Sequence, residues 1–103
     1  MSKYGLHGKL IATPGNASKL ADILIKASKL VATAEGCQLY VIGKDKSDAN
    51  AVWITEIWDT QEDHDKSLSV PGVKELITQA MPMLARKPEK GQELEILGGF
   101  GIK

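Results

Sequence analysis

The sequence has few of the features that secreted, membrane-spanning or nucleic-acid-binding proteins need. Cys37 is the only cysteine among 103 residues, so the chain cannot form an internal disulfide bond. No charged leader with an apolar stretch and a cleavage site is visible at the start. The longest apolar runs are far too short to cross a bilayer. We therefore expect a cytoplasmic protein with no membrane partner.

Excess charge and clustered metal ligands are also lacking. Thirteen basic and thirteen acidic side chains cancel at neutral pH, whereas phosphate binding needs a concentrated positive field. The nearest basic cluster, ARKPEK at residues 85–90, is interrupted by a proline and a glutamate. His7, Cys37 and His64 lie far apart in the sequence, without the spacing of a metal site. We expect neither a nucleic-acid partner nor a bound metal.

What the chain does contain is a succession of strand and helix patterns. Alternating or β-branched and aromatic residues predict strands at 4–13, 37–44, 51–59 and 93–102. The polar link DKSDAN joins the second and third of these strands and is typical of a hairpin loop, so the two should be antiparallel neighbours.

Apolar residues at three- and four-residue steps predict the helices. The first should begin at Asn16 or Ser18 and end at Gly36. Thr60 with Asp63 resembles a capping box and should start a short helix to about residue 68. The sequence SVPG breaks that helix, and a third follows over about 73–84, bent or closed by its proline.

The predicted order is β-α-β-β-α-β, with the second helical connection in two pieces. This is the ferredoxin-like pattern of an α+β protein. The chain shows no internal repeat and no composition shift that would divide it, so we predict a single domain over residues 1–103.

Both faces of the third predicted strand are largely apolar. Strand alternation places Val52, Ile54, Glu56 and Trp58 on one face and Trp53, Thr55 and Ile57 on the other. The helices of a ferredoxin-like fold cover one face only, and an uncovered apolar sheet would be an unusually large exposed patch. A second copy of the sheet is the simplest cover, so we expect a homodimer.

At this point the sequence resembles a known family. The segments TPGNASKLADIL, EGCQLYVI, VWITEIWD, TQEDHDKSL and VPGVKELITQAMPML, in this order and spacing, are similar to antibiotic biosynthesis monooxygenases, specifically their small quinol monooxygenase branch. The resemblance implies a dimeric α+β barrel with a pocket between the helices and the sheet in each subunit. It also implies oxidation of a quinol, phenolic or polyketide substrate by molecular oxygen, with neither metal nor flavin as cofactor.

The resemblance also points to site residues. Glu56 and Trp58 match the acid and the aromatic of the family's third strand, whereas Ser67 stands where many members carry a histidine. His64 follows the EDHD pattern of one branch. We take His64 and Glu56 as candidate catalytic residues, and Trp58, Ser67 and Leu68 as candidate substrate-binding residues.

Each candidate has a simpler interpretation. A histidine in the first turn of an amphipathic helix can be half exposed and bound to water, although imidazole also titrates near physiological pH and could accept a phenolic proton. A buried Glu56 needs a partner, such as a lysine or a backbone amide, unless it is protonated or functional. A strand tryptophan like Trp58 is often part of the core. The alternative to a cofactor-independent monooxygenase is therefore a non-catalytic dimer that binds a small apolar ligand or acts as a scaffold.

Overall fold

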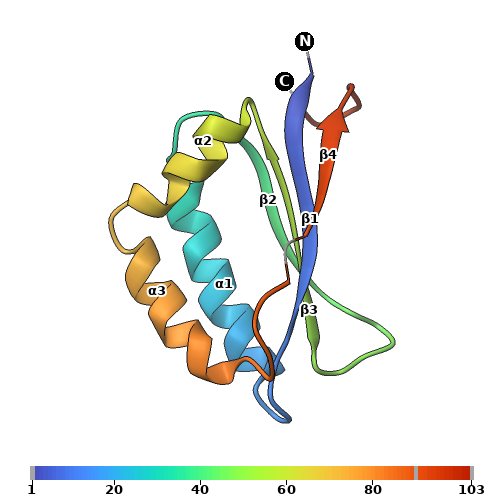
Figure 1. The fold of residues 1–103 in the computed structure, drawn as a ribbon, viewed down its shortest axis with the longest axis vertical. Helices are drawn as coiled ribbons and strands as arrows, with labels where there is room; N and C mark the ends of the chain where they lie inside the picture. The colour runs from blue at the N-terminus through green and yellow to red at the C-terminus, as the bar shows by residue number, and fades with distance from the viewer. Residues whose placement is uncertain (1, 90, 103) are drawn as a thin grey trace.

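A single four-stranded antiparallel sheet forms one layer of the protein (Figure 1). The computed structural model describes residues 2–89 and 91–102. The strands lie in the order β2-β3-β1-β4, and every neighbouring pair is antiparallel. Their bounds are β1 Lys3–Ile11, β2 Cys37–Lys44, β3 Ala51–Trp58 and β4 Gln92–Ile96. The predicted hairpin of the second and third strands is confirmed.

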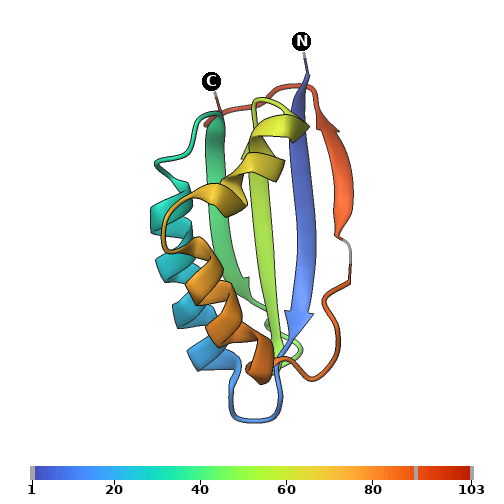
Figure 2. The ribbon, with the colours of Figure 1, turned by 60° about the vertical axis from the view of Figure 1, so that its left-hand side comes forward.

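The helices form a second layer on one face of this sheet (Figures 1 and 2). They are α1 Ala17–Val31, α2 Gln61–Lys66 and α3 Val73–Ala80, with short 3₁₀ turns η1 Ser67–Ser69 and η2 Met81–Met83. The second crossover is therefore split as predicted, and the fold is ferredoxin-like α+β. Among the described residues, no helix is long and apolar enough to pass through a bilayer.

Helix α1 begins where the sequence predicts it but ends earlier. Asn16 is the capping residue, yet its side chain donates a hydrogen bond to the Thr13 hydroxyl, 2.7 Å away, instead of capping the helix. The last helical residue is Val31, so the prediction that Gly36 ends the helix was wrong. Gly36 has φ 83° and lies just before β2, where a Cβ would overlap the Asp63 carboxylate. A glycine is needed there for the turn and the close approach.

The predicted cap of α2 is confirmed. The Thr60 hydroxyl accepts a hydrogen bond from the backbone N–H of Asp63 at 3.1 Å. Thr60→Ala should lower the free energy of unfolding by about 1 kcal/mol, because it leaves that N–H without its acceptor. Chemical denaturation measures this loss. Thr78→Ala is the control, since the Thr78 hydroxyl donates to the Lys74 carbonyl within α3 and caps no helix terminus. Equal losses in both variants would contradict the capping role.

Strand β4 is shorter than predicted. The sequence indicates a strand over 93–102, whereas β4 ends at Ile96. Gly98, Gly99 and Gly101 follow, and Gly101 adopts φ 96°, a conformation that interrupts a strand. Leu97 and Phe100 in this segment are exposed. The glycines thus outweigh the strand preference of the apolar residues between them.

Two apolar clusters fill the space between the helices and the sheet. One packs Leu20, Ile23 and Leu24 of α1 against Val52 of β3. The other surrounds Trp58, which has no exposed surface and packs with Val31 of α1 and Val73 of α3. The predicted inner face of β3 is confirmed, because Val52, Glu56 and Trp58 are all buried.

None of the described helices lies on the opposite face of the sheet (Figure 1). His7 of β1 lies there, paired with Thr55 of β3. Its ring stacks on Trp53 with centroids 4.7 Å apart, and its Nδ1 is 2.9 Å from the Thr55 hydroxyl. Val41 of β2 and Leu94 of β4 are about half exposed, at 51% and 47%. Homodimerisation through this outer face stays a prediction.

Candidate active site

A cavity of about 350 Å³ lies between the inner face of the sheet and the helices. Its volume is at the lower end of the range for small-molecule sites. Apolar side chains of α1 and α3, among them Leu24 and Ile77, form one part of its wall. The other part is polar and is formed by Tyr40, Glu56, His64, Asp65 and Ser67. A ligand in this cavity would meet ionisable groups on one side only.

Glu56 lies on β3 with only 8% of its surface exposed. Its Oε1 accepts a hydrogen bond from the indole N–H of Trp58, 3.0 Å away. The sequence suggested a lysine or a backbone amide as the partner of Glu56. The structure instead shows the indole of Trp58. Strand alternation explains the pairing, because residues 56 and 58 share a face. The second carboxylate oxygen, Oε2, has no hydrogen bond to the described residues.

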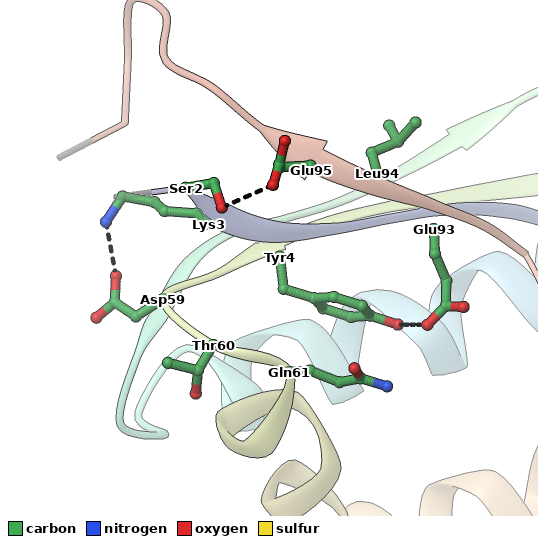
Figure 3. Close-up of a pocket in the computed structure, with 9 residues that line it drawn as sticks. All are labelled: Ser2, Lys3, Tyr4, Asp59, Thr60, Gln61, Glu93, Leu94 and Glu95. Atoms are coloured by element: carbon green, nitrogen blue, oxygen red, sulfur yellow. Dashed lines mark hydrogen bonds and ion pairs between the residues drawn. The ribbon is translucent and has the colours of Figure 1, made fainter.

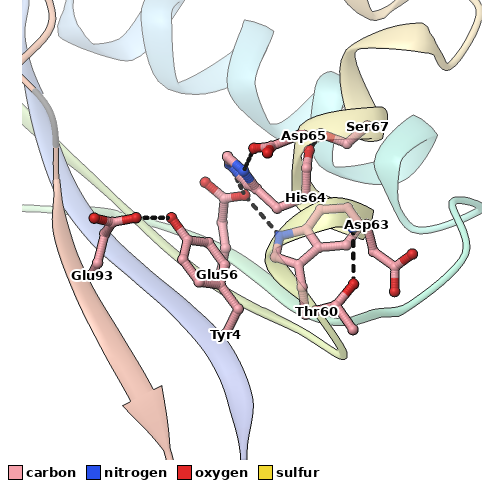
Figure 4. A network of polar contacts seen from close by, with 9 residues as sticks. Tyr4, Glu56, Thr60, Asp63, His64, Asp65, Ser67 and Glu93 are labelled. Carbon is pink, nitrogen blue, oxygen red and sulfur yellow. Dashed lines mark hydrogen bonds and ion pairs between the residues drawn. The ribbon is translucent and has the colours of Figure 1, made fainter.

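His64 approaches Glu56 from α2 (Figure 4). Its Nε2 is 3.6 Å from Glu56 Oε1, and its Nδ1 is 3.0 Å from Asp65 Oδ1. The Tyr4 ring packs against the imidazole with centroids 5.4 Å apart. Carboxylates at both ring nitrogens and an aromatic wall fix the orientation of the ring beside Glu56.

Burial sets the electrostatics of this site. It raises the pKa of Glu56, and the hydrogen bond from Trp58 and the nearby His64 only partly oppose it. Burial also raises the pKa of Tyr40, and the charge of Glu56 adds to the effect. A carboxyl group with a raised pKa is a stronger base, so the site is suited to accept a proton from a weak acid.

The three candidate substrate-binding residues differ in where they lie. Ser67 and Leu68 line the cavity, but the Ser67 hydroxyl already donates to the His64 carbonyl at 2.6 Å. Leu68 is half exposed at the rim. Trp58 is fully buried behind Glu56, so it holds the carboxylate rather than forming cavity wall. The structure thus places four of the five candidates at one cavity: Glu56, His64, Ser67 and Leu68.

Two further polar residues of the site were missed. Asp65 holds the His64 ring, and Tyr40 lines the cavity from β2. Asp65 follows His64 directly in the EDHD segment. The sequence could therefore have predicted the contact between the imidazole and this carboxylate. Tyr40 pairs directly with Glu56 across the hairpin, and only the register of the two strands reveals this.

A second, larger hollow lies at the end of the sheet beside α2 (Figure 3). Its volume is about 500 Å³, but it is an open groove. Its charged groups are engaged with one another: Lys3 pairs with Asp59 at 2.9 Å, and Tyr4 donates to Glu93 at 2.8 Å. Burial, together with Glu93, raises the pKa of Tyr4 to about 12. The described residues that line this groove include no buried acid or base, so the smaller cavity is the candidate active site.

Nothing in the described residues resembles a metal centre, since no three side chains of histidine, cysteine, aspartate or glutamate converge there. Glu56 and His64 can instead transfer a proton next to an apolar surface. Such a site can bind a neutral aromatic compound and accept a proton from it.

Comparison with known proteins gives a consistent picture. Residues 4–79 match the family model described as antibiotic biosynthesis monooxygenase. No curated protein matches the sequence. The crystal structure of a proposed antibiotic biosynthesis monooxygenase from Chloroflexus aurantiacus J-10-fl is 40% identical, with a TM-score of 0.88 over 99% of this chain and 100% of that one.

More distant structures share the fold. A proposed antibiotic biosynthesis monooxygenase from Caulobacter crescentus CB15 is 16% identical, with a TM-score of 0.84 over 94% of this chain and 92% of that one. Another from Nitrosomonas europaea is 10% identical, with a TM-score of 0.86 over 92% and 90% of the two chains. At these identities the likeness concerns the fold alone.

Proposed function

Because the chain belongs to the antibiotic biosynthesis monooxygenase family, we propose that it is a cofactor-independent monooxygenase. Its substrate would be a small quinol, phenolic or polyketide-like aromatic compound, and its oxidant molecular oxygen. One observation carries this proposal: the buried carboxyl of Glu56, with its raised pKa, lies beside His64 at the polar side of an otherwise apolar cavity.

The reaction would begin with proton transfer. Glu56, through Oε2, accepts the proton of the substrate, and His64 stabilises the carboxylate until then. The resulting electron-rich anion is oxidised by molecular oxygen. One oxygen atom replaces two hydrogens of the substrate as a carbonyl, and the other leaves with those hydrogens as water. The substrate supplies all the electrons.

The proposal includes a homodimer built on the outer face of the sheet. Trp53 and Ile57 of β3 and Val41 of β2 lie on this face, and Leu94 of β4 continues it. Stable interfaces bury an apolar centre with few unpaired charges, which this face offers. The cavities, on the inner face, would then remain accessible in both subunits.

Oxygen consumption tests the function directly. Metal-free protein is incubated with a panel of hydroquinones, naphthoquinols and anthrones, and an oxygen electrode records the rate, with boiled protein as the control. We expect at least one substrate to be oxidised faster than by the boiled sample. Tight binding of such compounds without any oxygen uptake would instead support a non-catalytic ligand-binding protein.

A further inference from the structure

Tyr40 lines the cavity and carries a hydroxyl group that has no partner among the described residues. The residue lies on β2 directly opposite Glu56 on β3, and both line the cavity. Tyr40 is half-buried. Its hydroxyl makes no hydrogen bond to the residues that the structure describes. Among those residues no buried side-chain oxygen or nitrogen lacks a partner, so the Tyr40 hydroxyl is an accessible group. It is therefore available to a ligand.

The protonation state of this hydroxyl suits a donor. Burial and the nearby Glu56 both raise the pKa of Tyr40, so the phenol keeps its proton at neutral pH. A neutral phenol beside a carboxylate favours a ligand oxygen that accepts a hydrogen bond, and it favours an anionic oxygen most strongly. An ionised Glu56 without Tyr40 would repel such an anion.

We propose that Tyr40 is a ligand-binding residue that donates a hydrogen bond to the phenolic oxygen of the substrate, beside the Glu56–His64 pair. The inference rests on the proposed function only in taking the ligand to be a phenol or quinol. Tyr40 binds the oxygen from which Glu56 takes the proton, and its hydrogen bond becomes stronger as that oxygen becomes negative. Once Glu56 has taken the proton it is neutral, and the Tyr40 hydrogen bond then stabilises the phenolate that remains.

Binding of 4-nitrophenol tests this role without any oxidation. Its neutral and ionised forms absorb at different wavelengths, so affinity and ionised fraction are read together. Tyr40→Phe should bind the probe roughly ten- to a hundredfold more weakly, as expected for a lost hydrogen bond to a charged group, and with a smaller ionised fraction. Tyr4→Phe is the matched control, because it keeps the ring that packs against His64 and removes only a hydroxyl that donates to Glu93. Tyr4 does not line the cavity.

A second measurement on the unmutated protein covers the case in which Tyr40→Phe does not fold. The chain has two tyrosines, so labelling tyrosine with ¹³C at the hydroxyl-bearing carbon gives one resonance for Tyr4 and one for Tyr40. The Tyr40 resonance should move on addition of the probe and the Tyr4 resonance should not.

The inference is overturned if the probe does not bind, if only the Tyr4 resonance moves, or if Tyr40→Phe binds as wild type does. Oxygen uptake is a separate measurement. Its absence, with Tyr40-dependent probe binding intact, would reject the monooxygenase and retain the ligand contact.

Discussion

Glu56→Gln should lower the rate of substrate oxidation by roughly 10²- to 10⁴-fold, the range typical for loss of a general base. The amide keeps the shape of the side chain and an oxygen that can accept the 3.0 Å hydrogen bond from Trp58. It cannot take up the proton of a phenol. Steady-state oxygen consumption measures the effect, and binding of the product quinone should be largely kept.

The pH dependence should report the same group. Burial raises the pKa of Glu56, and only the ionised carboxylate is a base. The wild-type rate should therefore rise with pH through an ionisation above the ordinary glutamate value of about 4.3. In Glu56→Gln this limb should be absent. A variant whose pH profile has the wild-type shape would show that another group accepts the proton.

Stability provides the control for Glu56→Gln. Because the pKa of Glu56 is higher in the folded state, folding favours the protonated carboxyl. That contribution is complete below the unfolded pKa and disappears as the pH rises through the folded pKa. A neutral glutamine should thus be no less stable than wild type at neutral pH. A large loss of stability at that pH would indicate a structural role instead.

His64→Ala tests which residue of the Glu56–His64 pair accepts the proton. If Glu56 is the base, the alanine variant should be slower than wild type but faster than Glu56→Gln, since the carboxylate remains. The assay needs a quinol whose own pKa lies well above the assay pH, because a substrate that ionises by itself would mask the effect. A greater loss in His64→Ala than in Glu56→Gln would assign proton acceptance to the histidine.

Ile57→Asp should abolish the proposed dimer. Ile57 lies on the outer face of β3, opposite Gly5 of β1 and Leu39 of β2. An unpaired charge buried in an interface costs about 3–5 kcal/mol, which weakens association more than about a hundredfold. Analytical ultracentrifugation should show monomer or aggregate for this variant. A well-folded dimer of Ile57→Asp would reject an interface on this face.

Two further variants show whether the interface or the subunit is affected. Val41 is 51% exposed on the same face. Val41→Asp should therefore change the free energy of unfolding of an isolated subunit little and weaken dimer association strongly. Ile25 is 40% exposed on α1, away from the sheet's outer face. Ile25→Asp should therefore leave the oligomeric state unchanged. Monomer from Val41→Asp with unchanged circular dichroism would identify the effect as loss of the interface.

The sequence by itself determined the order of elements and the inner face of β3. The period of the apolar residues distinguishes helix from strand locally, and a period of two places Glu56 with Trp58 on one face. The cap at Thr60 is also local, because it joins residues three apart. The end of β4 was predicted wrongly, and the reason is again local: glycines follow Ile96 and end the strand there.

Only the tertiary structure decided which residues complete the site. If Lys44 and Ala51 closed the hairpin around its six-residue loop, Tyr40 would lie opposite Thr55 on the outer face. In the structure Lys44 pairs with Val52, so Tyr40 lies opposite Glu56 instead. A shift of one residue turns every side chain of a strand to the other face. Loop geometry and packing of the whole sheet against the helices set that register, and no local pattern in the sequence specifies it.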